Sequence, residues 1–185
     1  MLVPMRAILD AADKNGYAQG AFNVNAVCQV KAAVDVHQIL RSPAIIQGAD
    51  LANGFMGGRT DFANSTLEDK KAGAKNIGAA VKKYAADSDI PVALHLDHGK
   101  NFDSCIAAIE GGYTSVMIDG SSLPFDENVE LTREVVKYAH ERGVTVEGEL
   151  GVLAGVEDHV FAATSTYTNP LSAIPCTVQT KARMQ

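Results

Sequence analysis

Three ionisable side chains interrupt an apolar segment of the chain, VALHLDHGKN at residues 92–101. They are His95, Asp97 and His98, and Gly99 follows them. Buried strands of parallel sheets are usually continuous runs of Val, Ile and Leu, so ionisable groups here need a reason. Imidazole and carboxylate groups bind divalent metals and carry protons in catalysis. The segment therefore indicates a strand that leaves the core and enters a chemical site.

Polar residues close four further predicted strands in the same way. Asn23 and Gln47 close the first two strands, and Asp119 and Glu149 close the fourth and fifth. In parallel α/β architectures, ligands bind at the carboxyl ends of the strands. One such residue alone is more typical of a cap or a turn, but five strand ends in succession indicate one shared site.

His98, Asp119 and Glu149 could together bind a divalent metal. Imidazole suits zinc, carboxylates admit zinc or a harder ion, and a catalytic zinc needs about three protein ligands. These ligands come from separate strands, so their spacing in the sequence is compatible with two interpretations. The three residues could form a metal site, or they could be ordinary strand caps. Successive strand residues point to opposite faces, so Asp97 and His98 can share a site only if the strand ends there, which Gly99 permits.

The remaining histidines are interpreted as structural or exposed. His37 lies on the apolar side of a predicted helix and is expected in the core. His95 is expected to be a hydrogen-bonded core residue, because it lies in the middle of a strand. His140 and His159 are expected to be exposed, the first at a charged helix end and the second in a loop.

No nucleophile stands out in the sequence. Cys105 lies in a predicted helix and is expected to be packed, and there is no GxSxG motif. Lys100 could form a Schiff base in principle, but it lacks the buried apolar setting that lowers the pKa of a catalytic lysine.

Strands and helices alternate along the chain. The predicted strands are 20–24, 43–48, 91–97, 115–121 and 144–151, and the predicted helices are 3–16, 26–42, 65–86, 102–112 and 126–143. A glycine-rich loop is expected at 53–65, a capping box at Ser65 and Glu68, and a helix cap at Asp103. Gly16 and Gly111 are predicted helix stops.

This alternation predicts an α/β protein with a parallel sheet, built either as an open doubly wound sheet or as a (β/α) barrel. The first strand is not followed by GxGxxG, and the chain has no GxxxxGK[ST] motif. Since the common nucleotide-phosphate loops are missing, the barrel is favoured.

Composition narrows the function further. The 185 residues suit one domain, and 16 basic against 22 acidic residues give a net charge of −6 without a basic run, which argues against nucleic acid as a partner. No apolar run is long enough to span a membrane, and the N-terminus lacks the apolar core of a signal peptide. The three cysteines are far apart, so a cytoplasmic protein is expected.

Six motifs in order resemble the class II, metal-dependent fructose-bisphosphate aldolases: GAFNVN, LHLDHG, SVMIDGSSLPFDENV, VEGELG, AGVEDH and TSTYTNP. The resemblance covers residues 1–170, and the related tagatose-bisphosphate aldolases share the motifs. It implies a TIM-type (β/α)8 barrel of which 1–170 supplies about the first five βα units, with 171–185 as a divergent tail.

The resemblance also implies a reaction, the reversible cleavage of fructose 1,6-bisphosphate to dihydroxyacetone phosphate and glyceraldehyde 3-phosphate. It assigns His98 as a ligand of the catalytic zinc. It assigns Asp119 and Glu149 to a second or alternative divalent-metal position. The implied partner is a small phosphorylated sugar, and family members are expected to be homo-oligomers.

Four further residues receive roles from the same resemblance. Asp97 matches the acid/base that serves the C4 hydroxyl, and Glu157 lies on a loop that carries a further acid/base. Asn23 and Gln47 lie at the substrate end.

Two departures from the family pattern affect these expectations. The run QGADLANGF lacks a serine that helps to hold a phosphate in many members, and no histidine follows His159 where the family takes two more zinc ligands. We therefore expect a shortened or frame-shifted gene product, or a fragment, that is weak or inactive alone. Its inward apolar side chains should face water or a rearranged neighbour, and the edges of strands 20–24 and 144–151 should be unpaired. The alternatives are a tagatose-bisphosphate aldolase and a non-catalytic aldolase remnant.

Overall fold

The computed structural model describes residues 1–152, 155–157, 160–180 and 183–184. Its main sheet contains β1 (Ala21–Asn23), β2 (Ala44–Ala49), β3 (Val92–Gly99), β4 (Ser115–Ile118), β5 (Thr145–Gly148) and β8 (Arg183–Met184). Its α-helices are α1 (Met5–Asn15), α2 (Val27–Leu40), α3 (Asp50–Met56), α4 (Leu67–Ala86), α5 (Phe102–Glu110), α6 (Phe125–His140) and α7 (Pro170–Thr180). A short 3-10 helix (Phe62–Asn64) and a hairpin of β6 (Gly155–Glu157) and β7 (Val160–Ala162) complete the described elements.

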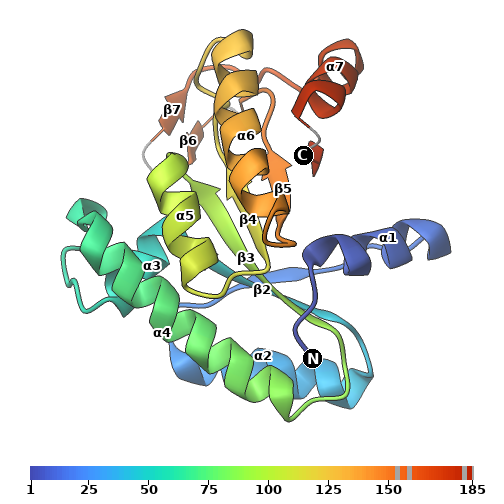
Figure 1. Ribbon diagram of the computed structural model, residues 1–185, viewed down its shortest axis with the longest axis vertical. Coiled ribbons are helices and arrows are strands. Elements are labelled where there is room, and N and C mark those ends of the chain that lie inside the picture. Colours follow the sequence, from blue (N-terminus) through green and yellow to red (C-terminus); the bar gives the residue numbers. More distant parts are fainter. Residues whose placement is uncertain (153–154, 158–159, 181–182, 185) are drawn as a thin grey trace.

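The main sheet is parallel throughout. Its strand order is β1-β2-β3-β4-β5-β8, and each neighbouring pair is parallel. The five strands predicted from the sequence are present, and a helix follows each of the first four, as Figure 1 shows. The expectation of an α/β fold with a parallel sheet is therefore confirmed.

The two faces of the sheet are covered differently. Helices α2, α4, α5 and α6 contribute to the larger core, which includes Ile46, Leu94 and Val116 from successive strands. On the other face, Met5 and Ile8 of α1 pack against Ile45 and Ala93. Figure 1 shows α1 set apart from α4, α5 and α6. The sequence left open whether inward apolar side chains face water or a neighbouring element, and Ile45 and Ala93 are covered by α1.

The predicted helix ends are partly correct. Gly16 ends α1 in the left-handed conformation with φ 66°, as expected, and Gly111 ends α5. The capping box lies one residue later than predicted, because Thr66 accepts from the backbone of Asp69 and the Asp69 carboxylate accepts from Thr66. The side chain that caps α5 is Asn101, not Asp103.

Residues 50–56 form helix α3 where a glycine-rich loop was expected from residue 53. The glycines of this region allow close packing. A Cβ on Gly73 would lie 1.7 Å from the carbonyl oxygen of Asn53, and one on Gly57 would lie 2.0 Å from that of Asp69. The glycines therefore let α3 and α4 approach each other.

The C-terminal segment, which the sequence resemblance marks as a divergent tail, has regular structure. Residues 170–180 form α7, and β8 pairs in parallel with β5. The expected free edge at β5 is therefore occupied by β8. The edge strands of the described sheet are β1 and β8.

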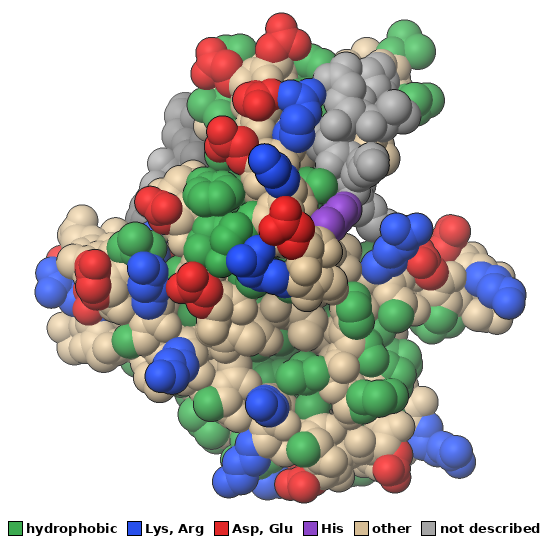
Figure 2. Space-filling model, viewed as in Figure 1, with side chains coloured by type: hydrophobic (Ala, Val, Ile, Leu, Met, Phe, Trp, Pro, Cys, Tyr) green, Lys and Arg blue, Asp and Glu red, His purple; other side chains and the backbone are tan. Residues whose placement is uncertain are grey.

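The surface carries mixed charge. On the face shown in Figure 2, acidic and basic side chains are interspersed over the helices, without a continuous basic patch on that face. Among the described residues, no helix has the length and hydropathy needed to cross a membrane.

Candidate metal and catalytic site

The end of β3 presents two reactive side chains together. His98 has a positive φ of 51°, and the pairing of β3 with β4 shifts register between Leu96 and Gly99. This left-handed residue breaks the strand alternation, so that the side chains of Asp97 and His98 both reach the carboxyl edge. The sequence pointed to Gly99 as the flexible position. Gly99 instead allows a close strand contact, since a Cβ there would lie 2.6 Å from the carbonyl oxygen of Met117.

His98, Asp119 and Glu149 meet at the carboxyl ends of β3, β4 and β5. Nδ1 of His98 lies 3.2 Å from Oδ2 of Asp119 and 3.7 Å from Oε2 of Glu149. One ligand atom from each residue lies within 4.8 Å of the others. Two bonds of about 2.0–2.1 Å at a tetrahedral metal place their ligand atoms about 3.4 Å apart, so the observed separations fit a zinc-sized ion.

The electrostatics of this cluster favour a bound cation. The hydrogen bond to Asp119 raises the pKa of His98 to about 9 against the opposing effect of burial, with further support from the charges of Asp97 and Glu149. The same hydrogen bond, with others from Ser121, holds the pKa of Asp119 well below its usual range. Without a metal, His98 is therefore protonated at neutral pH, and a metal at this imidazole would replace a proton.

Asp97 is held by two amide side chains, one from β1 and one from β2. Asn23 Nδ2 donates to Asp97 Oδ2 at 3.0 Å, and Gln47 Nε2 donates to Oδ1 at 3.1 Å. The sequence predicted that these three residues share one edge of the sheet. It did not predict that the amides fix the orientation of the carboxylate.

A second polar layer lies deeper on the same face. His95 Nδ1 lies 2.8 Å from Ser115 Oγ, and its Nε2 lies 3.6 Å from Oε2 of Glu147. Burial lowers the pKa of His95 to about 4, so its ring is neutral at physiological pH. The expectation of a hydrogen-bonded core histidine is confirmed.

The structure also bears on the sequence-based interpretations of the remaining histidines, of Cys105 and of Glu157. His37 is buried and its Nδ1 lies 2.7 Å from the carbonyl oxygen of Ala33, as expected for a packed residue, and His140 is exposed. Cys105 is buried, and burial raises its pKa, so its thiol is not activated. The backbone of Glu157 belongs to β6, while its side chain and the whole of His159 lie outside the described residues.

Sequence reasoning gave Ser121 no role and weighed Lys100 only for a Schiff base, but both residues contact Asp119. Ser121 donates to Asp119 Oδ1 from its backbone, at 3.2 Å, and from its hydroxyl, at 2.6 Å. Lys100 Nζ lies 3.8 Å from Asp119 Oδ2. The spacing of Asp119 and Ser121 is that of an Asx-turn, which was a usable signal for Ser121.

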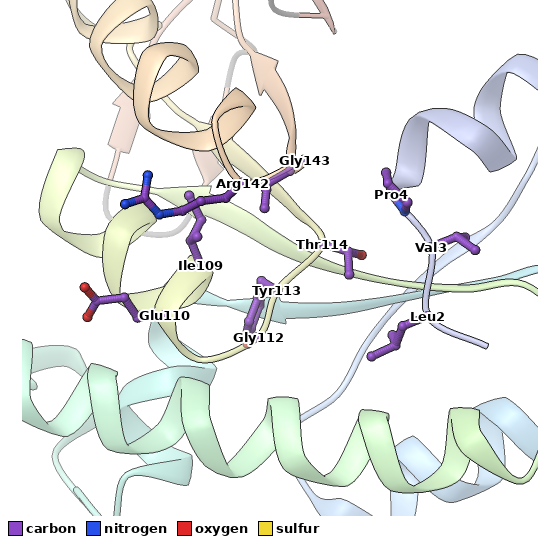
Figure 3. A pocket seen from close by; sticks show the side chains of 11 residues that line it. Leu2, Val3, Pro4, Ile109, Glu110, Gly112, Tyr113, Thr114, Arg142 and Gly143 are labelled. Carbon is purple, nitrogen blue, oxygen red and sulfur yellow. The ribbon is translucent and has the colours of Figure 1, made fainter.

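A cavity of about 400 Å³ lies at the opposite end of the sheet. Figure 3 shows the N-terminal segment Leu2–Pro4 opposite Thr114 and the turn at Gly143, and these residues line the cavity. Thr114 immediately precedes β4, so the cavity belongs to the amino ends of the strands. None of the residues that line it belongs to the polar cluster.

Comparison with known proteins identifies the family. A family model described as "Fructose-bisphosphate aldolase class-II" matches residues 3–184. The chain belongs to this family. Members of this family are generally metal-dependent. In this chain, a group of side chains that could hold a metal consists of His98, Asp119 and Glu149.

Relatives of known name agree with the family assignment. A fructose-bisphosphate aldolase of Treponema pallidum is 46% identical over 173 residues, and one of Geobacillus stearothermophilus is 41% identical over 171 residues. Each match covers 91% of this chain but only 48% and 54% of the respective relative. The chain thus spans about half the length of these relatives.

Solved structures agree on the fold. The YdjI aldolase from Escherichia coli K12 matches 98% of this chain with a TM-score of 0.75 and 28% identity, over 58% of its own length. A Coccidioides immitis protein provisionally named fructose-1,6-bisphosphate aldolase matches 94% of this chain with a TM-score of 0.76 at 24% identity, over 56% of its length. These neighbours are aldolases of the TIM-barrel type, which confirms the fold class expected from the sequence.

Proposed function

We propose that this chain binds a divalent metal, zinc in the first instance, through His98, Asp119 and Glu149, and that it serves class II aldol cleavage. The observation that carries the proposal is the convergence of these donors within 4.8 Å at the ends of three neighbouring strands. The raised pKa of His98 supports it, because the cluster already attracts a cation.

The proposed substrate is fructose 1,6-bisphosphate, as the names of the relatives suggest. A metal held at the cluster would polarise the C2 carbonyl as a Lewis acid. Asp97 would accept the proton of the C4 hydroxyl. The C3–C4 bond then breaks, C4 becomes the aldehyde of glyceraldehyde 3-phosphate, and the electron pair stays on the three-carbon fragment. A proton returned to C3 of that fragment, equivalent to the one taken from the C4 hydroxyl, gives dihydroxyacetone phosphate.

Asn23 and Gln47 orient the base for this step. Each donates to one oxygen of Asp97, so the carboxylate has a fixed direction while further lone pairs remain for a substrate hydroxyl. Glu157 is proposed as the further acid/base on the strength of the sequence resemblance alone. The proposed metal ligands therefore come from the ends of β3, β4 and β5, and the proposed proton carrier, Asp97, comes from the end of β3.

The proposed setting is central carbohydrate metabolism in the cytoplasm, with a homo-oligomer as the working form. The three cysteines are free thiols, which suits a reducing compartment. The segment 171–185 is proposed as a tail that diverges from the barrel pattern in sequence, although part of it pairs with the sheet through β8.

A cleavage assay tests the proposal. We expect the full chain to cleave fructose 1,6-bisphosphate slowly, a chelator to abolish the reaction, and zinc to restore it. Asp97→Asn should lower cleavage about 100-fold or to background, the usual effect of losing a general base, while zinc still binds because Asp97 is not one of the three proposed ligands. Asp103→Asn, an exposed change of the same type on α5, is the matched control. Cleavage that survives the chelator or Asp97→Asn contradicts the proposal.

A further inference from the structure

Lys100 lies beside the candidate metal ligands and has no part in the proposed reaction. It is the first residue after β3, and its Nζ lies 3.8 Å from Oδ2 of Asp119. The same oxygen lies 3.2 Å from Nδ1 of His98. One carboxylate oxygen is therefore shared by two basic side chains.

The orientation of Asp119 makes this shared oxygen the one that a metal must use. Its Oδ1 accepts two hydrogen bonds from Ser121, and its backbone N–H donates to the carbonyl oxygen of Gly99 at 3.0 Å. Oδ2 consequently faces His98 and Glu149, where the three ligand atoms converge. A metal bound at the cluster would lie against the oxygen that Lys100 contacts.

We propose that Lys100 is an internal counter-cation of the metal-free site and competes with the metal for Asp119. The inference rests on the proposed metal site. Without a metal, the ammonium offsets the mutual repulsion of Asp97, Asp119 and Glu149. A divalent ion that enters repels the ammonium, so the Lys100–Asp119 contact must break before Asp119 can bind the ion.

The side chain can make this movement. Lys100 is 30% exposed, whereas Asp119 is 11% exposed, so the lysine has a path to solvent while the carboxylate stays in place. Lys100 therefore stabilises the metal-free chain and weakens metal binding. These opposite effects distinguish the role from simple structural support, since loss of a structural residue weakens both folding and binding.

The test measures zinc affinity and metal-free stability in the full chain. Zinc affinity is read by competition with a chromogenic chelator, and stability by the thermal midpoint in excess chelator. Lys100→Gln should bind zinc about threefold to tenfold more tightly, as expected for the loss of one like charge at a partly exposed site. Its metal-free midpoint should fall. Lys100→Arg keeps the charge and should remain within about twofold of the parent affinity.

Lys31→Gln is the matched control for the change of charge. Lys31 forms an exposed ion pair with Asp35 on α2, remote in sequence from the cluster. Neither zinc affinity nor the midpoint should change appreciably in this variant. Equal or weaker zinc binding by Lys100→Gln, or an unchanged metal-free midpoint, overturns the inference.

The same titrations separate this inference from the proposed function. If the parent chain binds no zinc, and His98→Gln behaves identically, the proposed metal site fails and the inference fails with it. If zinc binds the parent chain and is lost in His98→Gln, while Lys100→Gln gains no affinity, only the role of Lys100 is overturned.

Discussion

The left-handed backbone of His98 brings the proposed proton carrier, Asp97, and the proposed metal ligand, His98, to one strand end. In a regular strand Asp97 and His98 would point to opposite faces. With φ at 51°, His98 meets Asp119 and Glu149 while Asp97 meets Asn23 and Gln47. Such a conformation is unfavourable for a residue other than glycine and is concentrated at functional sites. A local departure from regular geometry thus assembles the site.

His95 should make the chain less stable in mild acid. Its pKa falls from an ordinary value of 6.5 to about 4 in the folded chain, so between these values the unfolded state binds more protons. The free energy of unfolding should therefore fall as the pH drops from 6.5 to 4. Urea unfolding across this range measures how the free energy of unfolding changes with pH. This slope should be shallower in His95→Gln than in the parent chain, by at most about 1.4 kcal/mol per pH unit.

His140→Gln provides the control for that measurement, because His140 is exposed on α6. Its pH dependence should match that of the parent chain. If His95→Gln also retains the parent slope, burial of a neutral His95 is not the source of the acid sensitivity.

Sequence reasoning located these side chains but not their contacts. The polar strand ends and the parallel sheet placed Asn23, Gln47 and Asp97 at one edge, because the carboxyl ends of parallel strands coincide. The left-handed conformation of His98 left no comparable signal, since the strand pattern favours alternation and the adjacent glycine is the usual site of flexibility. The contact of Lys100 with Asp119 depends on the pairing of two strands and on a flexible side chain, which sequence spacing does not specify.

Helix boundaries in this chain are set by specific side chains and close backbone contacts. The sequence TLED places a hydroxyl and a carboxylate three residues apart at Thr66 and Asp69, while the neighbouring Ser65 and Glu68 have the same spacing. Two overlapping capping boxes explain the error of one residue in the prediction. Glycines near α3 are compatible in sequence with either a flexible loop or close helix packing. The three-dimensional structure shows that they allow close helix packing.

Removal of the Thr66 cap should destabilise the chain, and removal of the neighbouring hydroxyl should not. Thr66→Ala loses the acceptor for the backbone N–H of Asp69 and should cost about 1 kcal/mol of unfolding free energy. Ser65 Oγ is buried without a hydrogen-bond partner in the described structure, so Ser65→Ala should be neutral or slightly stabilising. Chemical denaturation of both variants measures the difference. Equal losses would assign the cap to both residues.

The described sheet leaves β1 as an exposed edge of the molecule. All three residues of β1 are exposed, and Phe22 keeps 48% of its surface accessible. A parallel edge strand with an exposed aromatic side chain favours association with another chain. The chain also spans about half the length of the curated relatives it matches and 58% of the YdjI aldolase.

We expect the chain to associate through this edge as its concentration rises. Sedimentation velocity over a wide concentration range should show species larger than the monomer. Phe22→Lys should shift the distribution toward monomer, because a charged residue on an edge strand disfavours pairing. Phe62→Lys changes an exposed aromatic residue of the 3-10 helix in the same way and should leave association unchanged. A single monomeric species at every concentration would contradict the expectation.

The zinc stoichiometry and affinity of the full chain test the central claim most directly. Isothermal titration calorimetry should find one zinc per chain, with a binding enthalpy that depends on the buffer because His98, whose pKa is about 9, releases a proton. His98→Gln should weaken binding about 100-fold or more, beyond the usual effect of outer-shell changes, while His140→Gln should bind as the parent does. Zinc binding of equal strength in His98→Gln, or no binding by the parent chain, would contradict the assignment of this site.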